Sequence, residues 1–126
     1  MTFEVGVRAA FQASHALRGD FGPATRPHQH DYRLEVAVRG ERLRADGTLV
    51  DIALLDQLLR GIVTELDGAS LDALPAFRES NSTAEEVARH IAERCETSLR
   101  GEGLARLVVR VWESADAYAA CERELG

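Results

Sequence analysis

Alternating apolar and polar residues mark the first forty positions of the chain as two extended segments. From residue 2 to 13 the odd positions are apolar and the even positions are mostly polar, and a period of two returns from residue 28 to 39. Side chains of a strand point alternately to its two faces, so each segment predicts a strand with one buried face. The glycine- and proline-rich stretch from 16 to 27 is expected to be the loop between them.

A spacing of three to four residues replaces this alternation in the middle of the chain. Apolar residues recur at that spacing from Ile52 to Leu66 and predict an amphipathic helix, with Asp51 as its N-cap. A second helix is expected to open at the capping-box sequence Ser82-Thr83-Ala84-Glu85 and to end at Gly101. Residues 67–81 between the helices are expected to be irregular.

Two further strands are predicted near the end of the chain, from Leu104 to Trp112 and from Ala117 to Glu122. The order strand, strand, helix, helix, strand, strand predicts a two-layer α+β fold with a single domain over residues 1–126. Its four-stranded antiparallel sheet would carry both helices on one face. Open sheet edges favour closure by oligomerisation.

Three of the four histidines continue the apolar faces of the first two strands. His28 and His30 share the parity of the core-facing residues that follow them, and His15 continues the parity that ends at Ala13. Converging neutral imidazoles are typical of zinc ligands. Two alternatives stay open, a buried histidine cluster without a metal and a break in the alternation between Ala13 and His15.

Glu113, like the three histidines, continues the apolar face of a predicted strand, here at the end of the third strand. It inherits the parity of the core-facing residues Val109 and Val111, which places a carboxylate on the apolar side of the sheet. The alternative is an ordinary solvated strand terminus.

Composition narrows the class of protein. The chain has 126 residues and a net charge of −6, and its arginines are dispersed among acidic residues, so nucleic acid is not an expected partner. No apolar run reaches membrane length and no signal-peptide pattern opens the chain. Two cysteines, Cys95 and Cys121, make no disulfide framework, and a cytoplasmic protein is expected. Lysine is absent, which excludes a Schiff-base mechanism.

The motifs, taken in order, resemble the 6-pyruvoyl-tetrahydropterin synthase / 6-carboxy-tetrahydropterin synthase family of the tunnelling-fold (T-fold) superfamily. Residues 11–15, Phe-Gln-Ala-Ser-His, resemble the family's Phe-x-Ala-x-His, and residues 28–32, His-Gln-His-Asp-Tyr, resemble its His-Gly-His-x-Tyr. The remaining matches follow at family spacing over nearly the whole chain: residues 47–52, Leu66-Asp67, Leu71-Asp72, Thr83-Ala84-Glu85 and Glu113.

The resemblance carries expectations about the site and the assembly. It implies that His15, His28 and His30 bind zinc and that Glu113 anchors the guanidine-like edge of a pterin. It also implies that subunits join their sheets into a barrel, as trimers stacked into hexamers, with sites at subunit interfaces.

Two departures from the family pattern remove proton-transfer groups. Ala24 stands at the position of the family's catalytic cysteine, and Gly68 stands where a catalytic histidine follows the Leu-Asp pair. Asp67 therefore lacks the imidazole that it would orient. Gln29 replaces the glycine between the two ligand histidines.

These features predict a zinc-dependent enzyme with altered chemistry on the pterin-synthase scaffold. The predicted reaction is metal-assisted carbonyl chemistry on a small polar substrate, of the carbon–carbon lyase or cyclase kind (aldol, Mannich or Pictet–Spengler), in specialised biosynthesis. Glu113 and Asp67 are the candidate catalytic residues, and Glu113, Thr83 and Arg26 are the candidate substrate-binding residues. Asp20, in the same loop as Arg26, is a further candidate.

Three alternatives to this function remain open from the sequence. The chain is an authentic pterin synthase with a replaced base, a non-catalytic protein that binds a pterin or an amine, or a protein whose zinc is purely structural.

Overall fold

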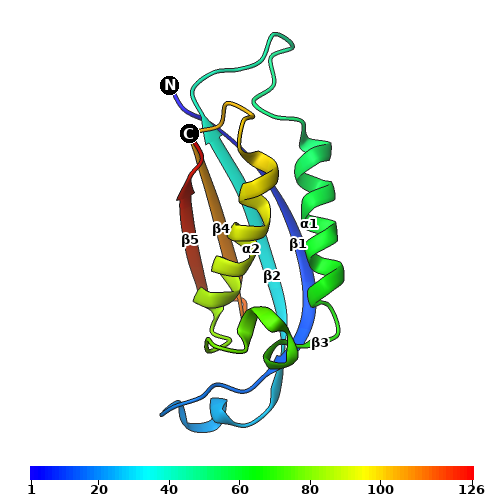
Figure 1. Ribbon diagram of the computed structural model, residues 1–126, viewed down its shortest axis with the longest axis vertical. Helices are drawn as coiled ribbons and strands as arrows, with labels where there is room; N and C mark the ends of the chain where they lie inside the picture. The colour runs from blue at the N-terminus through cyan, green and yellow to red at the C-terminus, as the bar shows by residue number, and fades with distance from the viewer.

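Two long antiparallel strands form the centre of the sheet in the computed structural model, which describes residues 1–126 (Figure 1). β1 (Phe3–His15) and β2 (His28–Gly40) pair along their whole length. β4 (Arg106–Trp112) pairs with β2, and β5 (Tyr118–Glu124) pairs with β4, both antiparallel. The alternation in the sequence therefore predicted these four strands, with ends that differ by one or two residues.

A fifth strand corrects the expected four-stranded antiparallel sheet. β3 (Ala69–Ser70) runs parallel to β1, so the strand order is β3-β1-β2-β4-β5. The chain is held there because Gly68 donates its backbone N–H to the Gln12 carbonyl oxygen, 2.7 Å away. Gly68 has a φ of +76°, a left-handed conformation that glycine adopts readily. Two residues are too few to produce a readable alternation.

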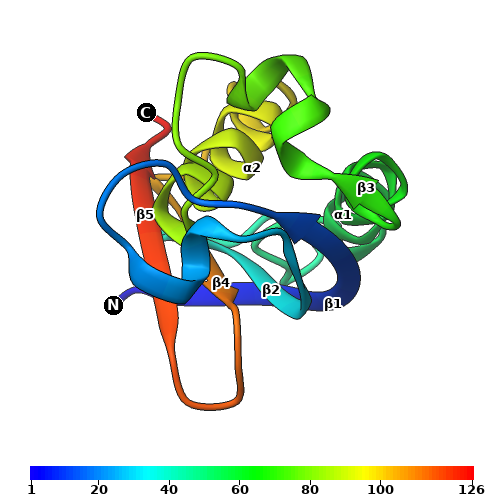
Figure 2. The same ribbon diagram turned by 90° about the horizontal axis from the view of Figure 1, so that it is seen from below.

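Both helices lie on one face of the sheet, as predicted (Figures 1 and 2). α1 (Ile52–Leu66) packs on β1, and α2 (Ala84–Leu99) packs on β4 and β5. The Asp51 side chain accepts a hydrogen bond from Ala53 N, which confirms the predicted N-cap of α1. Neither helix is long and apolar enough to cross a membrane.

The N-terminus of α2 corrects the expected capping box by one position. Thr83, not Ser82, is the N-cap, and its hydroxyl accepts a hydrogen bond from Glu86 N at 3.2 Å. The Ser-Thr pair offers two possible caps one residue apart, and the sequence does not decide between them. The Ser82 hydroxyl therefore does not cap the helix.

The hydrophobic core fills the space between the helices and the inward face of the sheet. Its cluster of 26 buried residues draws on both helices and on the inward positions of the strands. The opposite face of the sheet carries ion pairs such as Arg8 with Glu35 and Arg39 with Glu4. At one end of the sheet α1 ends, α2 begins, and the loop between β1 and β2 returns with a short 3₁₀ helix at Gly22–Thr25.

Candidate metal centre

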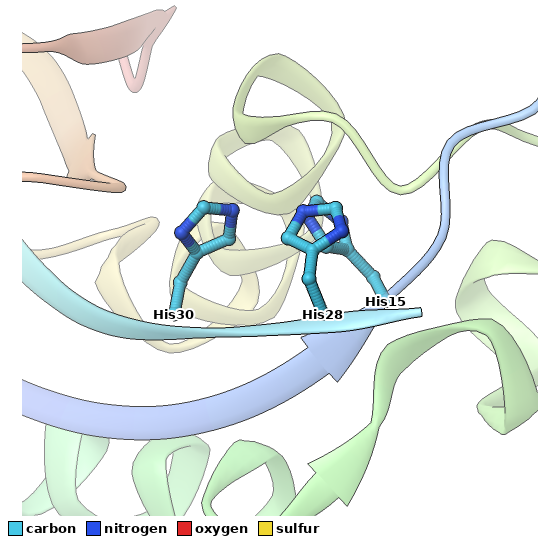
Figure 3. Close-up of side chains that lie close together, drawn as sticks. All are labelled: His15, His28 and His30. Atoms are coloured by element: carbon cyan, nitrogen blue, oxygen red, sulfur yellow. The ribbon is translucent and has the colours of Figure 1, made fainter. Parts of the chain in front are cut away.

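Three histidines meet at that end of the sheet. His15 and His28 are register partners on β1 and β2, and His30 pairs with Ala13 beside them. The ring centroids lie 4.5 Å apart for His15 and His28, 5.1 Å for His15 and His30, and 4.7 Å for His28 and His30. Their rings point to the same side of the two strands (Figure 3), and one ring nitrogen from each lies within 4.8 Å of the others.

The alternation of β1 continues through the predicted ligand. Ala13 and His15 both have an exposed fraction of 2%, and the β1–β2 pairing is unbroken from Phe3 to His15. The sequence had left open a break between these two residues, and the structure contains none.

Hydrogen bonds fix the protonation of two of the rings. Nδ1 of His15 lies 2.7 Å from the Ser82 carbonyl oxygen, and Nδ1 of His28 lies 2.7 Å from the Arg26 carbonyl oxygen. A carbonyl oxygen only accepts, so each Nδ1 carries a proton, and in the neutral ring each Nε2 then has the lone pair. Metal-bound histidines make this same kind of bond through their second nitrogen.

The donor set fits a metal ion. Nε2 of His15 is buried and has no hydrogen-bond partner in the protein. A buried polar atom without a partner is costly, and a metal ion held with the other two imidazoles would satisfy it. Burial lowers the pKa of His30, and the nearby rings of His15 and His28 lower it further against the opposing effect of Glu113. Neutral imidazole is the form that binds a metal.

Tyr32 lies directly beside the cluster. Its ring stacks on Phe11 with centroids 4.8 Å apart and meets the edge of His30 at 5.4 Å. The side chain is fully buried, and its hydroxyl has no hydrogen-bond partner in the protein. Burial and the negative charges of Glu113 and Asp72 raise the pKa of Tyr32, so the phenol stays protonated. Tyr32 has the inward parity of His28 and His30, and periodicity assigns no role to its hydroxyl.

Asp72 and Ser82 are a second feature that sequence reasoning missed. The Ser82 hydroxyl donates to Asp72 Oδ1 at 2.7 Å and lies 3.3 Å from Nδ1 of His15. The other carboxylate oxygen of Asp72 accepts from the backbone N–H of Ala16 at 2.8 Å. Asp72 belongs to the Leu71-Asp72 motif and Ser82 to the capping-box sequence, but neither pattern indicates that the two side chains meet beside His15.

Glu113 follows the last paired residue of β4, one position beyond the Arg33–Trp112 pair. It is half-buried, and its backbone N–H donates to Ala117 O at 3.2 Å to close the β4–β5 turn. Its negative charge raises the pKa values of both His30 and Tyr32. It also lines a cavity of about 360 Å³ with residues from the start of α2 and from β5, including Glu85 and Tyr118.

The side chains of three other candidate residues make no hydrogen bond to the three imidazoles. Asp67 is exposed, and its Oδ1 accepts from Gln12 N at 2.9 Å, which ties the end of α1 to β1. Thr83 caps α2. Arg26 is exposed and contributes its carbonyl oxygen to His28. Their predicted roles in catalysis and substrate binding remain predictions.

The loop that carries the first departure from the family pattern joins His15 to His28. Asp20 is exposed in it, and Ala24 accepts a hydrogen bond from Leu17 N through its carbonyl oxygen at 2.8 Å. Gly68, the second departure, is exposed next to Asp67. Neither Ala24 nor Gly68 has a side chain that can transfer a proton.

The fold and the cluster define a class of protein, a two-layer α+β domain with three imidazoles and a carboxylate at one end of its sheet. Comparison with known proteins gives the family. The family model described as 6-pyruvoyl tetrahydropterin synthase matches residues 4–124, and the chain belongs to this family.

Individual relatives agree with this membership. The chain is 33% identical to the 6-pyruvoyl tetrahydrobiopterin synthase of Homo sapiens over 70% of each chain. It is 24% identical to the 6-carboxy-5,6,7,8-tetrahydropterin synthase of Haemophilus influenzae, with 95% of this chain and 97% of that protein covered.

Solved structures confirm the T-fold. The 6-pyruvoyl tetrahydropterin synthase of Caenorhabditis elegans superposes with a TM-score of 0.84 at 21% identity, covering 98% of this chain and 97% of that one. The enzyme of the same name from Plasmodium vivax gives a TM-score of 0.82 at 18% identity, covering 98% and 99%.

Proposed function

We propose that this protein is a zinc-dependent enzyme of the pterin synthase family with altered chemistry. Its zinc would be held by His15, His28 and His30. The observation that carries the proposal is the buried Nε2 of His15, which has no partner in the protein and stands within a cluster of ring nitrogens less than 4.8 Å apart. When bound, zinc on three histidines supplies a Lewis acid that polarises a substrate oxygen.

The residues around the cluster favour a small substrate with an amine or amidine group. The Glu113 carboxylate accepts hydrogen bonds only, and charge-assisted bonds from N–H donors are its strongest interactions. The Tyr32 hydroxyl is protonated, buried and without a partner in the protein, so it is available to donate to a substrate oxygen. Together they orient a substrate that carries N–H groups at one end and a carbonyl or hydroxyl oxygen at the other.

The reaction is proposed to differ from the usual reaction of the family. Positioned general acids and bases contribute roughly two to four orders of magnitude each. The positions that the family pattern gives to a cysteine and a histidine hold Ala24 and Gly68. What remains supports carbonyl chemistry of the carbon–carbon lyase or cyclase kind, such as an aldol, Mannich or Pictet–Spengler reaction, in which Glu113 relays a proton and Asp67 assists from its position beside β1.

The site is proposed to be completed by neighbouring subunits in a homo-oligomer, a trimer or a hexamer of two trimers. The outer edge of β5 and most of the edge of β1 have no pairing partner within the chain, and unpaired edges are surfaces for strand addition. Glu113 lines a cavity beside β5, while Asp67 lies beside β1 at the other edge of the sheet. Joining these edges would bring the two carboxylates of different subunits toward one site.

Turnover assays on the zinc-loaded protein test the proposal. Dihydroneopterin triphosphate and a panel of aldehyde and amine pairs are offered to the wild type, to Glu113→Gln and to His28→Ala. The expected result is turnover of a carbonyl substrate that both substitutions abolish, with little turnover of the triphosphate. Unchanged turnover after zinc removal would contradict the proposal, and tight binding of a pterin without turnover of any candidate would indicate a binding protein.

A second candidate is an authentic pterin synthase with a replaced base. The 33% identity to a 6-pyruvoyl tetrahydrobiopterin synthase favours it. In that case the wild type converts dihydroneopterin triphosphate efficiently, and Asp67→Asn or Asp20→Asn abolishes the conversion.

A further inference from the structure

We propose that Asp72, acting through Ser82, is the positioning residue that holds His15 in its metal-binding tautomer and orientation. This inference rests on the proposed metal site but concerns residues to which no role has been assigned. Asp72 itself touches none of the three imidazoles directly by a hydrogen bond. It contacts the chain on both sides of His15, through the residue that follows His15 and through the residue that receives its ring proton.

The two oxygens of Asp72 are both used. Oδ2 accepts from the backbone N–H of Ala16 at 2.8 Å, immediately after His15 in β1. Oδ1 accepts from the Ser82 hydroxyl at 2.7 Å, just before the N-cap of α2. The end of β1 and the residue before the N-cap of α2 thus meet at one half-buried carboxylate. Such convergence fixes where the end of β1 lies relative to the start of α2.

The direction of the Ser82 hydroxyl adds a second acceptor beside Nδ1 of His15. A hydroxyl has one proton, and here it is directed to Asp72, so the oxygen faces His15 with a lone pair. The Ser82 carbonyl oxygen, 2.7 Å from Nδ1, is also an acceptor. With two acceptors around it Nδ1 keeps its proton, and the buried Nε2 is left as the metal-binding nitrogen.

The substitution Asp72→Asn would reverse the direction of the hydrogen bond between residue 72 and the Ser82 hydroxyl. The backbone N–H of Ala16 can only donate, so the amide oxygen of Asp72→Asn would face it and the amide NH₂ would face Ser82. The hydroxyl would then accept from the amide, and its own proton would turn away from residue 72. That proton competes with the proton on Nδ1 of His15, which disfavours the metal-binding tautomer.

Zinc affinity of the full-length protein, measured by competition with a chromophoric chelator, tests the role of Asp72. Loss of an outer hydrogen-bonding partner of a metal ligand weakens binding by about 10- to 100-fold, and this is the effect expected for Asp72→Asn. The matched control is Asp56→Asn, which removes an exposed carboxylate on α1 that pairs with Arg60. It is expected to bind zinc as the wild type does.

The double variant Asp72→Asn/Ser82→Ala separates a proton-directing role from a merely structural one. It removes the competing hydroxyl proton, so it is expected to regain part of the affinity lost in Asp72→Asn. A carboxylate that only ties segments together would give the opposite result, with the double variant binding zinc more weakly than either single variant.

Nitrogen chemical shifts of the His15 ring, measured without metal, give a readout that does not depend on zinc. The wild type is expected to show protonated Nδ1 and unprotonated Nε2, and Asp72→Asn a mixture of tautomers. Equal zinc affinity and equal ring shifts in wild type and Asp72→Asn would overturn the inference. If the wild type takes up no zinc while the ring shifts still change in Asp72→Asn, the proposed metal site fails and the positioning role of Asp72 stands.

Discussion

The middle and the end of the β1–β2 pair share one register and one inward face, yet they differ in chemistry. In the middle, inward pairs such as Val7 with Val36 and Ala9 with Leu34 offer only carbon atoms to the core. At the end the same alternation brings His15 opposite His28 and His30 opposite Ala13. The helices cover the middle, while short loops and helix termini cover the end.

This difference shows how a site arises without a change of backbone geometry. The ladder aligns the imidazoles for the same reason that it aligns the valines, because paired strands present every second residue to one face. The chemistry comes from polar atoms that the protein leaves without partners. The two buried side-chain atoms of this kind, Nε2 of His15 and the hydroxyl of Tyr32, both lie at the same end of the sheet.

The largest effect is expected from removing an imidazole at the end of the pair. His28→Ala should abolish stoichiometric zinc binding, because a structural or catalytic zinc needs at least three protein ligands. Metal analysis of the purified protein measures this. Gln29→Ala, at the neighbouring exposed position on the other face, is the matched control and should keep its zinc. Equal zinc content in both variants would refute the metal centre.

A substitution in the middle of the β1–β2 pair should lower the stability of the fold and leave metal binding unchanged. Leu34 has an exposed fraction of 1%, and Leu34→Ala is expected to lower the free energy of unfolding by about 2–5 kcal/mol. Urea denaturation gives this value. The folded variant should still take up zinc, so loss of zinc from a fully folded Leu34→Ala protein would mean that the two regions are not independent.

Zinc bound to the three histidines should raise the free energy of unfolding. At a free zinc concentration of about 100 times the dissociation constant, binding to the native state alone adds about 2.7 kcal/mol to the free energy of unfolding. Thermal unfolding with and without chelator measures this. The gain should vanish in His28→Ala and persist in Gln29→Ala.

Tyr32→Phe is expected to be neutral or stabilising in the metal-free protein. The hydroxyl is buried without a protein partner, so its removal relieves a desolvation cost of about 1 kcal/mol, and no hydrogen bond is lost. Urea denaturation measures the change. A clear loss of stability would show that the hydroxyl has a partner, such as a buried water.

The smallest effect concerns His90, the one histidine outside the cluster. It lies on α2 with its ring 5.5 Å from that of Phe77. Burial lowers its pKa below 6.5; the negative charge of Glu65 opposes this shift, and the positive charge of Arg94 adds to it. The unfolded chain therefore binds the proton first as the pH falls, and the stability that neutral His90 contributes is full above pH 6.5 and is lost as the pH drops through the lower folded pKa. His90→Gln should show a smaller loss of stability over this window in urea titrations.

Much of this architecture could be predicted because it depends on periodicity. The strands, both helices and the inward direction of the three histidines follow from periods of two and of three to four residues, which backbone geometry imposes locally. β3 could not be predicted in this way, since its two residues are placed by hydrogen bonds to a residue distant in the sequence. Gln12 donates its backbone N–H to Asp67 Oδ1, and Gly68 donates its backbone N–H to the Gln12 carbonyl oxygen.

The sequence by itself determined which face of β1 and β2 carries the imidazoles and which family the motifs resemble. Only the tertiary structure decided which polar groups surround those imidazoles. Asp67 and Asp72 lie five residues apart in the connection between the two helices, yet Asp67 binds the edge of β1, and Asp72 reaches Ser82 and the end of β1 beside His15. Outside the long helices and strands the direction of a side chain depends on long-range contacts, and no local pattern records it.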